Sequence, residues 1–223
     1  MIDTVLHFRV VENKDWATIL FVIAFATIAL TKSAFENRFA EFAKLIYSDK
    51  YTNVYKDGSH LNSGFTIALF FVQLISFSFF IQISLANFGY GSKTDWILFI
   101  QIITFLIYFV FSKFLIEKII ATAFSIEEII EQFNLQKVTF RTYIGIFLLP
   151  INIILFYYDA VSREFMLVLI SILLISSVLT YLVSIKNYQN IIFSKLFYFI
   201  LYLCALEIAP YYFMYYWFTK GIA

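Results

Sequence analysis

The chain has 223 residues, of which 62% are hydrophobic and only 14% charged, whereas a soluble domain usually carries about 25% charged residues. Its net charge of +1 leaves no basic surface for nucleic acid, so no nucleic-acid partner is expected. The single cysteine, Cys204, excludes an intramolecular disulfide, and the two histidines have no metal-ligating neighbour at a useful spacing, so neither a metal site nor a cofactor is expected.

The apolar residues fall into about six blocks of membrane-spanning length. Crossing a hydrocarbon core takes about 20 apolar residues per helix. The sequence therefore predicts an all-α, polytopic membrane helix bundle, formed by a single integral membrane domain over residues 1–223. The predicted spans, in chain order, cover about 16–32, 65–86, 96–112, 143–158, 165–185 and 196–218.

The first span has an alternative interpretation as the apolar region of a cleavable signal peptide. Its flank does not fit that interpretation well. Glu12, Lys14 and Asp15 mix charges of both signs, and no Ala-x-Ala follows the apolar run. A retained membrane span is therefore favoured.

Two polar segments between the spans carry apolar residues at helical spacing. In the segment at about 33–48, Phe35, Phe39 and Phe42 recur on one face. The segment at about 113–134 continues the periodicity of the third span. Both segments are predicted to be amphipathic helices that lie on the cytoplasmic membrane surface or against a partner protein.

The lysine and arginine residues of the loops predict the orientation in the membrane. Eleven of them fall on one side of the six-span arrangement and five on the other. By the positive-inside rule the richer side faces the cytoplasm, so both termini are predicted to be extracytoplasmic. Trp16, Trp96 and Trp217 then all lie at the outer interface, which is the expected depth for tryptophan anchors.

A short sequence echo links two of the spans. Lys14-Asp15-Trp16 opens the first span, and Thr94-Asp95-Trp96 opens the third span eighty residues later. A parallel repeat of helix hairpins would give this pattern, but only the Asp-Trp pair matches well, and chance similarity is the simpler explanation. The two aspartates are expected to cap their helices rather than to form a paired-carboxylate site.

Glu207 is the one acidic residue at the centre of a predicted span, and Pro210 follows three residues later. An ionised carboxylate at that depth costs about 2.5–3.5 kcal/mol on insertion scales, so Glu207 should be neutral, paired or in contact with water. Proline also frees a backbone carbonyl in the preceding turn. The pair indicates either a hydrogen-bonded kink that fixes helix packing, or a site for an ion, a proton or a partner's polar group.

Uncharged amides at membrane depth form a second group of polar candidates. Such groups usually hydrogen-bond between helices and contribute about 0.6–2 kcal/mol each, although they can also line a translocation path. The candidates are Gln73, Gln82, Gln101 and Asn152. In the fifth span, Ser176, Thr180 and Ser184 lie four residues apart, which predicts a face that contacts another helix of the chain or of a partner.

The sequence contains no nucleophile–histidine pair, zinc-binding spacing or phosphate-cradling glycine loop. No catalytic residue is therefore expected, and the protein is predicted not to be an enzyme.

Three short motifs carry a resemblance to a known family. They are Asp15-Trp16 at the start of the first span, Ser33-x-Phe35-x-x-Arg38-Phe39 just beyond it, and Leu206-Glu207-Ile208-x-Pro210 in the last span. With these motifs the chain resembles, over nearly its whole length, a domain-of-unknown-function family of small polytopic inner-membrane proteins from Bacteroidota-type bacteria. The resemblance implies a bacterial inner membrane, several helices and no known activity, and it makes Glu207 and Pro210 motif positions.

We therefore expect a non-enzymatic accessory or assembly subunit of a larger bacterial inner-membrane complex, with both termini in the periplasm. Its expected partners are the lipid bilayer and either other membrane proteins or further copies of itself. The alternative is a small transporter or channel for an ion or lipid, with Glu207 in its path. Stoichiometric partners in mild detergent would favour the subunit, and flux in liposomes would favour the transporter.

Overall fold

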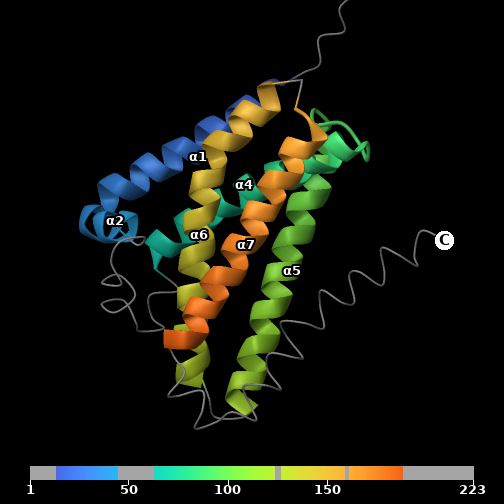
Figure 1. The fold of residues 1–223 in the computed structure, drawn as a ribbon. Helices are drawn as coiled ribbons and strands as arrows, with labels where there is room; N and C mark the ends of the chain where they lie inside the picture. The colour runs from blue at the N-terminus through green and yellow to red at the C-terminus, as the bar shows by residue number, and fades with distance from the viewer. Residues whose placement is uncertain (1–13, 45–62, 124–126, 159–160, 188–223) are drawn as a thin grey trace, which may run out of the picture.

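The computed structural model describes residues 14–44, 63–123, 127–158 and 161–187, and the elements within these ranges are helices (Figure 1). They are α1 (Asp15–Ala34), α2 (Glu36–Ala43), α4 (Gly64–Phe88), α5 (Trp96–Ala123), α6 (Glu127–Tyr157) and α7 (Arg163–Asn187). No strand occurs in the described ranges, so the predicted all-α fold is confirmed. The sixth expected span, with Glu207 and Pro210, lies outside them.

Of the helices in the described ranges, five are long and apolar enough to cross a membrane: α1, α4, α5, α6 and α7. They lie at the positions of the first five expected spans, but α5 and α6 extend further. The amphipathic segment expected at about 113–134 is divided between the end of α5 and the beginning of α6, and α6 continues into the fourth expected span as one helix of 31 residues. The reason is local: no glycine or proline interrupts residues 127–144, so nothing ends the helix there.

The two aspartates that were expected to cap helices behave differently. The Asp95 Oδ1 accepts hydrogen bonds from the backbone N–H groups of Ile97 (2.9 Å) and Leu98 (3.3 Å), so Asp95 caps α5 as predicted. The prediction for Asp15 is wrong, because α1 already begins at Asp15 and Lys14 occupies the capping position. An acidic residue in the first turn still interacts favourably with the helix dipole.

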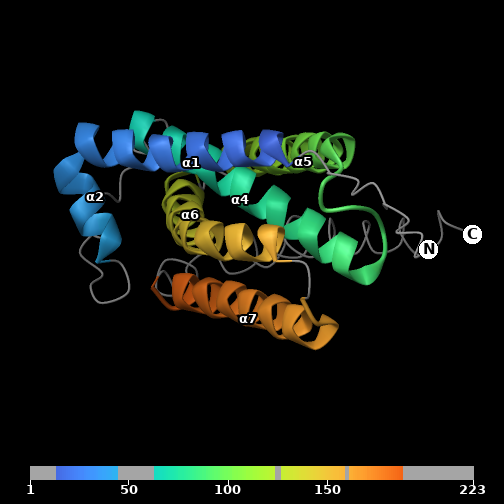
Figure 2. The ribbon, with the colours of Figure 1, turned by 90° about the horizontal axis from the view of Figure 1, so that it is seen from above.

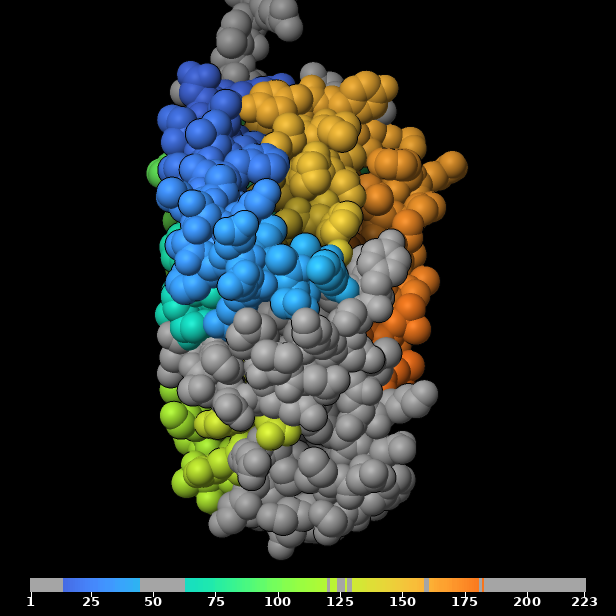
Figure 3. Space-filling model, turned by 90° about the vertical axis from the view of Figure 1, so that its left-hand side faces the viewer, coloured from blue at the N-terminus to red at the C-terminus, as the bar shows by residue number. Residues whose placement is uncertain are grey.

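The central helix of the bundle is α4. In its span 56% of the residues are buried, against only 6% in the spans of α5 and α7. It packs most extensively against α6 and also contacts α1 and α5. Figures 2 and 3 show α6 between α1 and α7. Within the described part of the chain, broad apolar faces of α5 and α7 are therefore left for lipid or another protein.

An aromatic cluster joins four helices at the end of the bundle where α1 and α5 begin. Its centre is Phe79 of α4, which is fully buried. The Phe79 ring lies 4.2 Å from that of Phe21, 4.6 Å from that of Phe99 and 5.7 Å from that of Phe156, centroid to centroid. Trp16 stacks on it at 5.7 Å. Because lipid tails are as apolar as these rings, close packing and ring geometry hold the cluster together.

Part of the apolar face of α2 packs on the chain itself. Phe42 is only 4% exposed and lies edge-on to Phe65 of α4 and Tyr143 of α6, with centroid distances of 5.8 and 5.5 Å. Phe39 is half-buried against the same group. Phe35, between α1 and α2, remains 40% exposed. The sequence pattern showed which face is apolar but not what covers it.

Candidate functional site

Buried polar side chains connect α4 to α6. Gln73 is 2% exposed, and its Oε1 accepts a hydrogen bond from the Thr142 Oγ1 at 2.8 Å. One turn further along α6, Gly145 lies so close that a Cβ there would be 3.2 Å from the Gln73 Cα. Two turns beyond that, the Asn152 Nδ2 donates to the backbone oxygen of Ser76 at 2.7 Å. Two of the predicted amides thus join the most closely packed helices of the bundle.

A third predicted amide, Gln82, organises the connection between α4 and α5. It is fully buried, and its Nε2 donates to the backbone oxygens of Asp95 (2.7 Å) and Ser92 (3.2 Å). Gly89 ends α4 with φ +91°, a left-handed conformation that glycine adopts without strain. Gln82 therefore holds the turn from which Asp95 starts α5.

The remaining candidates are not brought together with these amides. Gln101 is exposed on α5. Ser176 and Thr180 are half-buried on α7, and their hydroxyls donate to carbonyl oxygens of their own helix at 2.8 and 2.9 Å. Ser184 belongs to α7 as well. Glu207 and Pro210 lie outside the described residues.

One motif residue, Arg38 of α2, anchors its helix to the beginning of α4. It is only 8% exposed, and its guanidinium donates to the Ser63 Oγ at 2.7 Å and to the Thr66 Oγ1 at 3.2 Å. The guanidinium also lies 4.6 Å above the centroid of the Phe65 ring. Since the Ser63 Oγ caps α4, Arg38 contacts the residues that set where α4 begins.

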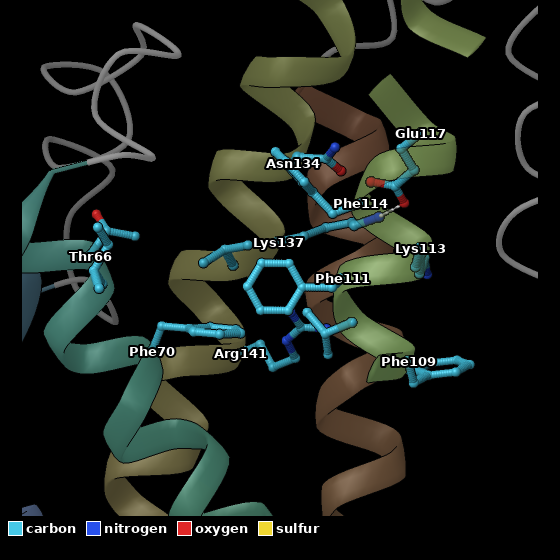
Figure 4. A pocket seen from close by; sticks show the side chains of 13 residues that line it. Thr66, Phe70, Phe109, Phe111, Lys113, Phe114, Glu117, Asn134, Lys137 and Arg141 are labelled. Atoms are coloured by element: carbon cyan, nitrogen blue, oxygen red, sulfur yellow. Dashed lines mark ion pairs between the residues drawn. The ribbon is translucent and has the colours of Figure 1, made fainter. Parts of the chain in front are cut away.

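A pocket of about 210 Å³ opens between α4, α5 and α6 (Figure 4). Four charged side chains line it: Lys113 and Glu117 from α5, and Lys137 and Arg141 from α6. The Lys137 Nζ lies 3.6 Å from the Glu117 Oε1, and Glu117 is 4% exposed. Side chains of both charges therefore line the pocket.

The rest of the lining is mainly aromatic and aliphatic, with one buried amide. Asn134 of α6 is 6% exposed, and its Oδ1 accepts no hydrogen bond from the described part of the chain. It lies three and seven residues before Lys137 and Arg141, on the same face of α6. Phe70, Phe111 and Phe114 provide much of the apolar wall.

The pocket lies at the level of one membrane interface if the bundle spans a bilayer. Along α5, Lys113 and Glu117 are about 26 and 32 Å from Trp96 at 1.5 Å per residue. A hydrocarbon core is about 30 Å thick, so a Trp96 ring at one interface places both residues near the other. By the loop charges, that interface is predicted to be the cytoplasmic one.

The pocket residues were not singled out from the sequence as a site. Lys113, Lys137 and Arg141 entered only the orientation count. A signal was present, because Lys113 and Glu117 are four residues apart, as are Lys137 and Arg141, and each pair therefore shares a helix face. Only the packing of α5 beside α6 shows that the two faces meet.

The lining of this pocket combines cationic, anionic and apolar side chains. Lysine and arginine donate charge-assisted hydrogen bonds to phosphate and carboxylate oxygens. Within the described ranges, no group of three or more His, Cys, Asp or Glu side chains is placed to hold a metal ion.

Comparison with known proteins shows the family of the chain. No curated protein and no solved structure matches it. The family model described as a domain of unknown function (DUF4271) matches residues 17–218. This range includes Phe35, Arg38, Phe39, Glu207 and Pro210, whereas Asp15 and Trp16 lie just before it. The chain therefore belongs to the DUF4271 family, as its short motifs suggested.

Proposed function

We propose that this protein is a non-enzymatic subunit of a larger bacterial inner-membrane complex, where it supports assembly or stability. The observation behind this proposal is that the buried amides hydrogen-bond within the chain. Gln73, Gln82 and Asn152 are at most 2% exposed and hydrogen-bond to helices and loops of the same chain. A translocation path needs polar groups that water can reach. Amides enclosed in this way support a packing role and favour the subunit over the transporter.

The helices on the outside of the bundle supply surface for a partner. On α7, the large side chains of Leu174, Val178 and Leu182 share one exposed face, with exposed fractions of 62%, 58% and 56%. An equally apolar face on α1 includes Val22, which is 62% exposed. We propose that the partner contacts α7 rather than α1, because only 6% of the α7 span is buried, against 22% of the α1 span, and α7 lies at the edge of the bundle beside α6 (Figure 2).

The test is purification of the full chain from its own bacterium in mild detergent, with cross-linking and a measurement of stoichiometry. A partner bound at fixed stoichiometry and cross-linked to α7 supports the proposal. Val178→Trp should lower its recovery, whereas the matched Val22→Trp, at a site of nearly equal exposure, should not. A protein that purifies alone and conducts ions or moves lipid in liposomes would overturn the proposal in favour of the transporter.

A further inference from the structure

We propose that the sixth predicted span, residues 196–218, packs antiparallel to α5 and covers an exposed polar stripe on that helix. The stripe consists of Gln101, Thr104 and Tyr108. Within this contact, the carboxyl group of Glu207 hydrogen-bonds to the hydroxyls of Thr104 and Tyr108. The contact does not depend on the proposed role as a subunit. It is inferred from the stripe, from its depth in the bundle and from the length of chain that follows α7.

The polar stripe runs along one face of α5. Gln101, Thr104 and Tyr108 are spaced three and four residues apart, so they share a helix face. All three are exposed, Tyr108 by 72%. None of them forms a hydrogen bond with another of the described residues. Polar side chains in membrane helices usually hydrogen-bond to a neighbouring helix, so we expect a helix to cover this face.

The stripe lies at the depth of the hydrocarbon core. At 1.5 Å per residue, Thr104 and Tyr108 are about 12 and 18 Å along α5 from Trp96. With Trp96 at one interface of a core about 30 Å thick, Tyr108 lies near the middle. A tyrosine at an interface has water and headgroups as partners for its hydroxyl, but a tyrosine at this depth needs a protein partner. Contact with lipid alone would therefore leave the stripe unsatisfied.

The chain that follows α7 returns in the required direction. The Asn87 Nδ2, near the end of α4, donates to the Val161 backbone oxygen at 2.9 Å, so α7 begins near the connection from which α5 begins. Figure 1 shows α5 and α7 running in the same direction. A span that follows α7 back across the membrane is therefore antiparallel to both helices.

The connection to the last span is long enough to reach α5. Residues 188–195 separate Asn187 from the predicted span, and eight residues extend over at most about 29 Å. Both α5 and α7 contact α6. Since the axes of packed helices are about 8–10 Å apart, α5 lies within about 20 Å of α7 where each contacts α6.

Glu207 has the depth of the stripe in this arrangement. Trp217 is predicted to lie at the same interface as Trp96, and Glu207 precedes it by ten residues, or about 15 Å. This depth lies between those of Thr104 and Tyr108. A carboxyl group in the membrane interior needs a polar partner, and hydroxyls both donate and accept hydrogen bonds. One contact therefore satisfies Glu207 and the stripe together.

The first experiment uses Cys204, the single cysteine of the chain, which is predicted to lie about 20 Å from Trp217 and level with Tyr108. In Tyr108→Cys, oxidation with copper phenanthroline in membranes should link the introduced thiol to Cys204 of the same chain, as a disulfide-linked peptide in mass spectrometry. The matched control is Leu115→Cys. Leu115 shares the helix face and is 56% exposed, but it lies about 10 Å further along α5, beyond the range of a disulfide at the level of Tyr108.

The second experiment tests the hydrogen bond by a double-mutant cycle in one detergent. Tyr108→Phe should lower the melting temperature by about 2–4 °C, as the loss of one hydrogen bond would in a chain of this size. The same substitution should have no further effect in a Glu207→Leu background, because its partner is already absent. Tyr90→Phe, at a site of 76% exposure outside α5, should change the melting temperature in neither background.

The proposal is overturned if Tyr108→Cys forms no disulfide with Cys204, or if Leu115→Cys forms it equally well. A covalent dimer of Tyr108→Cys that persists when Cys204→Ser is added would assign the stripe to a second copy of the chain, which also overturns the proposal. Additive effects of Tyr108→Phe and Glu207→Leu would exclude the hydrogen bond. None of these outcomes depends on whether a partner protein binds α7, so their failure would leave the proposed function standing.

Discussion

Trp16 and Trp96, eighty residues apart in the sequence, contact each other at the start of α1 and α5. Their ring centroids are 6.1 Å apart with an interplanar angle of 71°, an edge-to-face arrangement. The Trp16 Nε1 also donates a hydrogen bond to the Thr94 backbone oxygen at 3.3 Å. The tryptophans of the two Asp-Trp pairs therefore meet at one end of the bundle, where both α1 and α5 begin.

Removing the Trp16 ring should destabilise this end of the bundle. Trp16 is half-buried and stacks on Phe79, whereas Trp96 is 52% exposed. We expect Trp16→Ala to lower the free energy of unfolding by about 3 kcal/mol, and Trp96→Ala by clearly less. Thermal unfolding in a single detergent measures both. Equal losses would show that the cluster around Phe79 does not depend on the Trp16 ring.

The close approach of α4 and α6 gives a second prediction. A Cβ at Gly145 would lie 3.0–3.2 Å from atoms of Gln73, including its Cα, so Gly145→Ala must push the two helices apart. We expect a loss of about 1–3 kcal/mol in the free energy of unfolding. Gly64→Ala is the matched control, because its nearest described neighbour, the Phe35 Cζ, would be 3.7 Å away, an ordinary contact. An unchanged melting temperature for Gly145→Ala would contradict the packing of α4 on α6.

The helices could be predicted from the sequence, but the faces that they bury could not. Gln73 and Gln101 are both amides inside apolar spans, yet Gln73 is buried and Gln101 is exposed. In a helix that is apolar all round, periodicity does not distinguish the lipid side from the protein side. Which face of the helix is buried depends on packing against distant parts of the chain, and no local sequence pattern carries that information.

The cap of α5 could also be predicted from the sequence, whereas the pocket could not. The Asp95 cap follows from residues within one turn and was predicted. The ion pair of Glu117 with Lys137 joins residues from two helices, and their positions in the sequence do not show that α5 and α6 meet there. The prediction for Asp15 failed by a single position, because α1 begins one residue earlier than the sequence suggested.

Arg38 should control the attachment of α2 to α4. Arg38→Gln removes the charge-assisted hydrogen bonds to Ser63 and Thr66, so α2 should detach and its amides should exchange faster. Arg38→Lys should rescue only part of the protection, since an ammonium group lacks the planar fork. Hydrogen–deuterium exchange of residues 36–43 measures this, with the exposed Lys44→Gln as the control. Unchanged protection in Arg38→Gln would show that Phe42 alone holds α2.

The orientation in the membrane can be tested with reporter fusions. Eleven of the sixteen lysine and arginine residues fall on one side of the six-span arrangement, and this predicts both termini in the periplasm. An alkaline phosphatase fusion after Ala223 should be active, and a fusion within 50–60 should be inactive. A cytoplasmic C-terminus would mean that either the number of spans or the orientation is wrong.

The substitution of Glu207 distinguishes a subunit from a transporter. Glu207→Gln keeps the size and the hydrogen-bonding capacity of the side chain without its charge, so we expect normal folding and normal partner binding. Glu207→Leu removes that capacity at a predicted mid-span position and should lower the recovery of the complex. Both variants are compared by yield, melting temperature and partner stoichiometry in the same detergent. If Glu207→Gln instead folds normally but abolishes a flux that the native protein shows in liposomes, the carboxylate carries ions or protons, and the subunit proposal fails.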